Sequence, residues 1–330
     1  MLFRRWPRLA HTLPHVDLGV SGSAIEGWLH DDVMLNVKRD DRSTPTLGGN
    51  KARALELLLA GVRPGDRLLT VGSTGSTHAL SVAHFGAQLG ATTQVVTWPQ
   101  EEHDVSRATA ERLRTLASVT VAASPVTAMM RAGFIRATSR QRWIPSGGST
   151  PLGALGHAAA ALELADRPAD SYGFDTLVVP LGTGGTAAGL LVGLALAGLP
   201  TRVLGVRVVP RIIANRSRVL RLARRTAQLF GRLAGVAPPT IDESRFAIDE
   251  DQYGGAYARE TLAARELASF VRERGGPELD GTYSAKTLAA ALAQARRAPH
   301  ERVLFWLTFD GRWLAASDDA RDNTSSQESR

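Results

Sequence analysis

Residues 175–189 read DTLVVPLGTGGTAAG, and this stretch decides the fold class. The apolar run Thr176–Val179 leads through a turn of glycine and threonine into an uncharged helical segment. A buried strand that joins a helix in this way is typical of parallel sheets in α/β proteins. We therefore expect an α/β fold whose ligands bind beyond the carboxyl ends of the strands.

The same alternation of strands and helices runs through most of the chain. Apolar and β-branched runs predict strands at 33–37, 67–71, 93–97, 119–122, 176–179, 203–208 and 302–307. Helical spacing predicts helices at 51–60, 77–89, 105–116, 125–138, 152–165, 186–199, 212–233, 256–274 and 285–296. Strands separated by helices imply mostly parallel sheets with helices on both faces.

The turn at 182–186 predicts a site for an anion. Its glycines allow backbone N–H groups to converge, the helix that follows adds positive potential, and the hydroxyls of Thr183 and Thr186 can donate. Phosphate is the anion that this pattern fits best, although a tight strand-to-helix turn also needs glycine. Five residues form this candidate site: Gly182, Thr183, Gly184, Gly185 and Thr186.

A dinucleotide site is an alternative interpretation of the same turn. Gly182-x-Gly184-x-x-Ala187 approximates the fingerprint of NAD-binding folds. The strand at 204–208 lacks the acidic residue that would hold a ribose, but Arg207 could accept a 2′-phosphate. An NADP-binding oxidoreductase therefore stays open.

Residues 47–51 read LGGNK and place a lysine at the start of a predicted helix. Asn50 is a preferred N-cap residue, so Lys51 should face the positive end of the helix dipole. A cation is disfavoured there, so the pKa of the Lys51 amine should fall and its nucleophilic neutral form become more accessible. A lysine that forms a Schiff base needs this property, whereas the plainer alternative is a solvated lysine after a loop.

Residues 73–78 read STGSTH and place hydroxyls and an imidazole before another predicted helix. Such a segment can hold a carboxylate, although N-capping alone also explains Ser or Thr there. The eight histidines are scattered without metal-ligand spacing, so we expect no metal. The chain has no cysteine, which excludes disulfides and thiolate nucleophiles.

Much of the net charge of +7 comes from the segment Arg211–Arg232, which contains seven arginines. Apolar residues between them predict an amphipathic helix with a solvated face, and we expect neither a nucleic-acid nor a membrane partner. The uncharged run 176–201 has the length of a membrane span, but Pro180 and glycines interrupt it. The polar tail 317–330 is predicted to be disordered.

Six segments, taken in order, resemble the pyridoxal-phosphate enzymes of fold type II. More narrowly they resemble the 1-aminocyclopropane-1-carboxylate deaminase and D-cysteine desulfhydrase family, over about Asn36 to Thr308. The segments are Lys38–Asp41, Gly48–Arg53, Gly72–His78, Gly147–Gly156, Gly182–Thr186 and Tyr283–Lys286. The resemblance implies a tryptophan synthase β-like fold of two open, mostly parallel twisted sheets flanked by helices.

The resemblance also implies the cofactor, pyridoxal 5′-phosphate, and the residues around it. Lys51 would carry the cofactor as a Schiff base and move the substrate's proton, with Ser76 and Tyr283 as further catalytic residues. The implied cofactor contacts are Asn50, Lys51, Thr77, the turn Gly182–Thr186, and Thr308 beside the ring nitrogen. The implied substrate contacts are Ser76, Thr77, His78 and Tyr283.

Three departures from the family pattern shape the expected reaction. Gly75 and Thr77 stand where relatives usually have glutamine and asparagine, which predicts a looser or larger carboxylate site. Ser284 stands where the deaminases carry a glutamate that pairs with the ring nitrogen, so the ring should be a weaker electron sink. We expect a lyase or deaminase of the D-cysteine desulfhydrase type, in which α,β-elimination gives a keto acid and ammonia. Deaminase-type ring opening and a non-catalytic PLP- or ligand-binding member remain alternatives.

The resemblance divides the chain into two domains. Residues 1–51 and 156–330 would form a large cofactor-binding domain, and residues 52–155 a small inserted α/β domain. We expect a small amino acid as the substrate, a homodimer and a cytoplasmic location.

Overall fold

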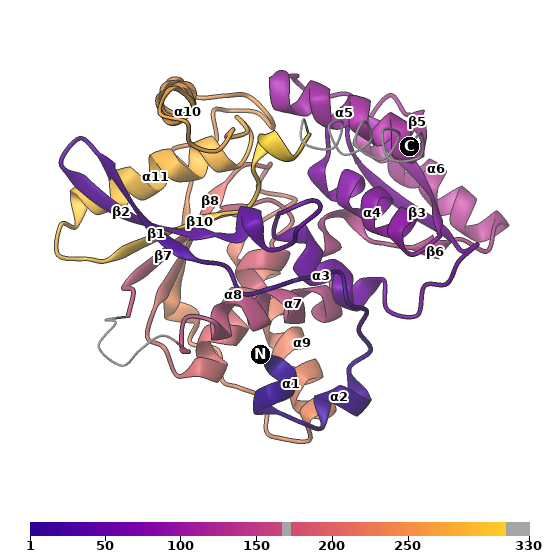
Figure 1. The fold of residues 1–330 in the computed structure, drawn as a ribbon, viewed down its shortest axis with the longest axis horizontal. Helices are drawn as coiled ribbons and strands as arrows, with labels where there is room; N and C mark the ends of the chain where they lie inside the picture. Colours follow the sequence, from indigo (N-terminus) through magenta and orange to yellow (C-terminus); the bar gives the residue numbers. More distant parts are fainter. Residues whose placement is uncertain (167–172, 315–330) are drawn as a thin grey trace, which may run out of the picture.

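The computed structural model describes residues 1–166 and 173–314, and its strands form two sheets (Figure 1). The tail predicted to be disordered, 317–330, lies outside the described residues. Nearly all of the two sheets is parallel, as predicted, because helices connect most successive strands.

The larger sheet has six strands in the order β1-β2-β10-β7-β8-β9. Their bounds are β1 Ile25–His30, β2 Val33–Arg39, β10 Val303–Leu307, β7 Thr176–Leu181, β8 Arg202–Arg207 and β9 Phe246–Asp249. Only β1 runs antiparallel to its neighbour.

The smaller sheet is wholly parallel and has the order β5-β4-β3-β6. Its strands are β3 Arg67–Ser73, β4 Thr92–Trp98, β5 Ser118–Val121 and β6 Arg142–Trp143. The sheet is covered on one side by α3 Lys51–Leu58, α4 Thr77–Gln88 and α5 Asp104–Leu116, and on the other by α6 Pro125–Thr138.

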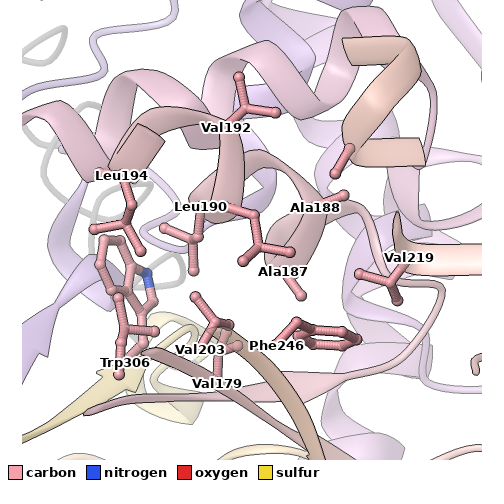
Figure 2. Close-up of a cluster of buried hydrophobic side chains, with 14 of the residues drawn as sticks. Val179, Ala187, Ala188, Leu190, Val192, Leu194, Val203, Val219, Phe246 and Trp306 are labelled. Atoms are coloured by element: carbon pink, nitrogen blue, oxygen red, sulfur yellow. The ribbon is translucent and has the colours of Figure 1, made fainter. Parts of the chain in front are cut away.

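Helices cover both faces of the larger sheet. One face packs against α7 Pro151–Leu162, α8 Gly185–Ala197 and α9 Arg216–Ala234, and the other against α10 Leu262–Glu273 and α11 Ser284–Arg297. Figure 2 shows Ala187 and Leu190 of α8 facing Val179 and Val203 of the strands. The helix α8 is apolar on all sides, and its residues 185–194 are buried inside this layer. The short helices α1 Leu2–Arg5 and α2 Leu9–Thr12 lie beside α9 (Figure 1).

Every predicted strand and helix has a counterpart, but three strands and the short helices α1 and α2 were missed. The edge strand β1 carries Gly27 and alternates only weakly, β6 has two residues, and β9 has four. The prediction of a helix at 256–274 was wrong for residues 256–261. The helix begins at Leu262, where the hydroxyl of Thr261 accepts from Ala264 N, and Ala258 before it has a φ of 64°.

The arginine-rich segment forms α9, which begins at Arg216 rather than 212. Arg216 and Arg224 make ion pairs with Glu243, and Arg211 before the helix pairs with Glu250. Part of its positive charge is therefore neutralised within the chain. Within 1–166 and 173–314, no helix has both the length and the apolar character needed to cross a membrane.

Candidate active site

Lys51 is the first residue of α3, and segments from three parts of the chain meet around it. Asn50 has helical backbone angles and makes no N-cap bond, so the predicted cap was wrong. Instead its side-chain Nδ2 donates to Thr186 Oγ1 at 3.0 Å, and its backbone N–H donates to the carbonyl of Thr308 at 3.0 Å. The lysine segment is thus fixed to the glycine turn and to the end of β10.

The pKa of Lys51 is lowered to about 8. Burial is the largest cause, while the negative charges of Asp280 and Asp40 act in the opposite direction. The lower pKa predicted from the sequence is confirmed, but its main cause is burial rather than the helix dipole. Near neutral pH a larger share of this amine is therefore unprotonated than in an ordinary lysine.

Two buried histidines lie close enough to Lys51 for its charge to affect their pKa values. Burial lowers the pKa of His78 and of His157 to about 3, and the charge of Lys51 contributes to both shifts. Nδ1 of each ring is buried, and no described residue forms a hydrogen bond with it. His78 lies in the core with Nε2 3.5 Å from Thr70 Oγ1, so its predicted contact with substrate stays a prediction.

A buried ion network lies behind the lysine. Arg53 contacts Asp40 at 2.6 Å and Glu163 at 2.7 Å, and Lys38 contacts the same Glu163 at 2.5 Å. Trp306 Nε1 donates to the second oxygen of Asp40 at 3.0 Å. Burial alone would raise the pKa of Asp40, but the charge of Arg53 and its hydrogen bonds lower it. These contacts hold α3 against β2, β10 and α7.

The predicted anion turn joins β7 to α8. Gly184 has a φ of 90°, a conformation that favours glycine, and it places Gly185 at the first turn of α8. Gly185 N donates to Ser149 Oγ at 3.0 Å, and Ser149 Oγ lies 2.5 Å from Thr183 Oγ1. The Gly185 N–H therefore points at an oxygen acceptor, and the hydroxyls of Ser149 and Thr183 are bonded to each other. Ser149, which the sequence reasoning did not assign, is the added member of this cradle.

Ser76 caps α4, since its hydroxyl accepts from Ala79 N at 3.3 Å, and Thr77 is the first helical residue. Gly75 just before has a φ of 77°. A Cβ at Gly75 would lie 2.5 Å from the carbonyl oxygen of Ser106. A side chain at residue 75 would therefore collide with α5, and the looser or larger carboxylate site stays a prediction.

Tyr283 belongs to a chain of three hydroxyls. Its hydroxyl lies 2.8 Å from that of Tyr257, which lies 3.1 Å from Ser73 Oγ. Burial raises the pKa of Tyr283 well above its usual value and also raises that of Tyr257. Tyr283 also packs on the glycine turn, because a Cβ at Gly182 would lie 3.4 Å from Tyr283 Cε1. Tyr257 was missed because the sequence pattern placed it inside a helix.

Asp280 fixes the start of α11. Its carboxylate accepts backbone N–H bonds from Thr282 at 3.1 Å, Tyr283 at 2.6 Å and Ser284 at 3.1 Å. Ser284 is fully buried, with its hydroxyl 3.5 Å from the carbonyl of Phe309. Asp280 thereby sets the position of Tyr283 and, together with Asp40, acts on the pKa of Lys51 through its negative charge.

A cavity lies beside this site, enclosed by residues of loops and helices and by two tyrosines. Gly75, Thr77, Tyr257, Asp280 and Tyr283 line it together with the first turn of α5. In the described part of the chain, no group of three or more His, Asp or Glu side chains could hold a metal ion.

A buried lysine of lowered pKa, joined through Asn50 to a glycine turn at a helix start, suits an α/β enzyme that holds a phosphorylated carbonyl cofactor. A model described as "Pyridoxal-phosphate dependent enzyme" matches residues 29–308. The chain belongs to this family, and its cofactor is pyridoxal 5′-phosphate. Its fold is that of the fold type II enzymes, as the resemblance implied.

Curated relatives and a solved structure agree with this family. Nocardicin C-9′ epimerase of Nocardia uniformis subsp. tsuyamanensis is 32% identical, with 82% of this chain and 85% of that protein covered. A D-cysteine desulfhydrase of Serratia proteamaculans (strain 568) is 32% identical, with 88% and 92% covered. The structure of an ACC deaminase homologue superposes with a TM-score of 0.76 at 26% identity, covering 94% of each chain.

The contacts of Arg207 and of the glycine turn do not favour a dinucleotide site. Arg207, which would have held a 2′-phosphate, is buried and bonded to Glu250 at 2.8 Å. The glycine turn instead contacts Asn50, the neighbour of the family's lysine, through Thr186.

Proposed function

We propose that the protein catalyses α,β-elimination on a small β-substituted amino acid, releasing a keto acid and ammonia. The observation that carries the proposal is Lys51, a buried amine whose pKa is about 8, joined through Asn50 to the phosphate cradle. When bound, pyridoxal phosphate withdraws electrons from the Cα of the amino acid and makes its proton acidic.

Each residue has a task that follows from its contacts. The turn Gly182–Thr186 and Ser149 hold the phosphate, and Asn50 ties that turn to the lysine segment. Lys51 Nζ accepts the Cα proton, because burial keeps much of this amine neutral. Ser76 binds the substrate carboxylate at the positive end of α4.

The tyrosine pair provides the acid. Because burial raises the pKa of both Tyr257 and Tyr283, each keeps its proton at physiological pH. Tyr283 hydroxyl can donate to the departing β-substituent, with Tyr257 and Ser73 orienting it. Cα proton abstraction and protonation of the leaving group thus fall to different side chains.

Ser284 favours elimination over ring opening. It is buried and supplies no carboxylate to a ring nitrogen, and Thr308 is the residue we propose beside that nitrogen. A weaker electron sink suffices for elimination because a good leaving group departs from the β-carbon.

The test is turnover by purified protein reconstituted with pyridoxal phosphate. Sulfide and pyruvate from D-cysteine or L-cysteine support the proposal, and Lys51→Ala should lack both the visible absorption band of the bound cofactor and the activity. Release of 2-oxobutanoate from 1-aminocyclopropane-1-carboxylate would favour the ring-opening alternative. A coloured protein that turns over none of these three compounds would favour the non-catalytic alternative.

We also propose the domain bounds given above, a homodimeric assembly and a cytoplasmic location. The domain bounds are supported by the smaller sheet, whose strands all fall within 52–155. The assembly and the location rest on the family resemblance and, for the location, on the lack of cysteines.

A further inference from the structure

We propose that Lys286 is a positioning residue for the tyrosine pair. Its side chain holds the loop 250–261, which connects β9 to α10 and presents Tyr257 to Tyr283. Lys286 acts through Tyr257 rather than on the reacting atoms. The inference rests on the proposed function, because this loop carries one member of the pair that provides the acid.

Lysine is rare in this chain. Only three of its 39 lysine and arginine residues are lysines, namely Lys38, Lys51 and Lys286. Lys38 contacts Glu163 at 2.5 Å, and Lys51 is the reactive lysine of the proposed function. An arginine is larger and keeps its proton, so a chain that uses arginine elsewhere is expected to keep lysine where a compact amine is needed. For Lys286 that need has to be found in its contacts.

Lys286 is a buried amine that contacts no carboxylate. The residue is 0% exposed, and among the described residues its Nζ forms no ion pair but donates to the backbone carbonyl of Tyr253 at 2.9 Å. Burial lowers the pKa of this amine to about 8, while the charges of Asp280, Glu260 and Glu101 act in the opposite direction. An apolar side chain of similar size would avoid the cost of burying the amine, so stability alone does not explain Lys286.

The loop 250–261 needs such a contact because it has no regular structure. Gly254 and Gly255 have φ values of 70° and 81°, and Ala258 has 64°, so neither a helix nor a strand can run through it. A Cβ at Gly254 would lie 3.6 Å from Lys286 Nζ, so the amine reaches the turn formed by the two glycines. The bond from Lys286 therefore fixes the backbone at the start of this turn.

The two tyrosines lie on two segments that Lys286 joins. Tyr283 immediately precedes α11, and Lys286 stands in the first turn of that helix. Tyr257 follows Tyr253 in the loop, and its hydroxyl lies 2.8 Å from that of Tyr283 and 3.1 Å from Ser73 Oγ. These distances require that the loop and the helix start keep a fixed relative position. The bond between Lys286 and Tyr253 provides this constraint.

Fluorine NMR provides the first test, which is independent of activity. The chain has 4 tyrosines, so the cofactor-loaded protein labelled with 3-fluorotyrosine should give one resonance for each, and Tyr257→Phe identifies the resonance of Tyr257. In Lys286→Met this resonance should move toward its position in the urea-unfolded protein, because the loop is released. An unchanged Tyr257 resonance in Lys286→Met overturns the proposal.

The control is Gln294→Met. Gln294 is also a buried polar residue of α11, but its Nε2 donates to Glu301 at 2.8 Å, away from the loop. The control should leave the Tyr257 resonance in place. An equal movement in Gln294→Met and Lys286→Met would mean that a general loosening of α11 is responsible, and it would overturn the proposal.

A second variant covers the case in which Lys286→Met does not fold. Lys286→Gln has a side chain that is one bond shorter than lysine, so its amide nitrogen should not reach the carbonyl of Tyr253. The Tyr257 resonance should therefore move in the same direction in Lys286→Gln. A folded Lys286→Gln with an unmoved Tyr257 resonance contradicts the proposal.

Kinetics provides the second test, with the enantiomer of cysteine that the unaltered protein turns over. Lys286→Met should lower kcat about fivefold to tenfold and change KM little, as expected for the loss of one hydrogen bond in the transition state. The double variant with Tyr257→Phe should be no slower than Tyr257→Phe alone, because Lys286 acts only through the Tyr257 hydroxyl. An unchanged kcat in Lys286→Met, or losses that multiply in the double variant, would overturn the proposal.

The two tests separate the two proposals. If the protein catalyses no elimination but Lys286→Met still displaces the Tyr257 resonance, the proposed function fails and the positioning by Lys286 stands. If the protein is active and Lys286→Met changes neither the resonance nor kcat, the function stands and the role of Lys286 is wrong.

Discussion

Asn50 Nδ2 donates to Thr186 Oγ1 over 3.0 Å, although 136 residues separate the two in sequence. The bond joins the residue next to Lys51 to the turn that would hold the cofactor's phosphate. Both partners are buried, so water does not compete for the bond. Lys51 and the turn Gly182–Thr186 are therefore tied together by a bond within the protein itself.

Asn50→Ala should weaken pyridoxal phosphate binding, because the lysine segment loses its tie to the cradle. Thr186→Val should do the same. In a double-mutant cycle on the cofactor's dissociation constant, the two changes should show a coupling of about 1 kcal/mol. Strictly additive effects would mean that the bond does not contribute to cofactor binding.

Loading of the cofactor should depend on pH through Lys51. Its pKa of about 8 means that the neutral, reactive form becomes dominant as the pH rises through 8. The rate at which the visible band grows after pyridoxal phosphate is added should rise with a midpoint near pH 8. A rate still rising steeply above pH 10 would indicate an ordinary lysine, and Lys51→Ala should give no band.

The parallel sheets were predictable because buried strands and amphipathic helices each have a characteristic spacing of apolar residues in the sequence. The edge strands of the sheets were not predictable. β1 and β6 are specified by pairing with β2 and β3 rather than by their own short patterns. The same limit applies to Tyr257, because helical spacing continues through residues that Ala258, at φ 64°, holds in a loop.

The positions of Lys51 at the start of α3 and of the glycine turn at the start of α8 were predictable because glycine turns and helix starts are local. Contacts between segments that are far apart in the sequence were not predictable. Asn50 suits an N-cap by its residue type, yet its side chain bonds to Thr186 across the fold. Gly75 suggested open space, yet the backbone of Ser106 lies against it.

Tyr257→Phe should lower kcat with little change in stability. The substitution removes the hydroxyl that links Ser73 to Tyr283, and it leaves the ring in place. We expect kcat to fall about fivefold to tenfold, the loss of one hydrogen bond in the transition state. Tyr253→Phe is the control, since Tyr253 lies in the same loop and accepts from Lys286 through its backbone carbonyl. Equal kcat values in the two variants would remove Tyr257 from the mechanism.

Arg53→Met should destabilise the fold strongly. It removes the positive charge that contacts the buried carboxylate of Asp40, which keeps only its bonds from Trp306 and Ser23, and it leaves one oxygen of Glu163 without a partner. Breaking a buried pair in this way costs about 3–5 kcal/mol. Arg224→Met removes an exposed pair with Glu243 and should change the urea midpoint little. Similar midpoints for the two variants would show that the network behind Lys51 is not a stabilising element.

The two histidines near Lys51 should make stability fall in mild acid. Their folded-state pKa values of about 3 lie below the ordinary value of 6.5, so only the unfolded chain binds these protons between pH 6.5 and 3. The free energy of unfolding should therefore fall as the pH drops below 6.5, by up to about 1.4 kcal/mol per pH unit for each histidine. His157→Gln should reduce the pH dependence of the free energy of unfolding, obtained from urea unfolding curves between pH 7 and 5, by the contribution of one histidine. The same substitution at the exposed His11 should not reduce it. An unchanged pH slope in His157→Gln would mean that His157 is protonated as readily in the folded protein as in the unfolded chain.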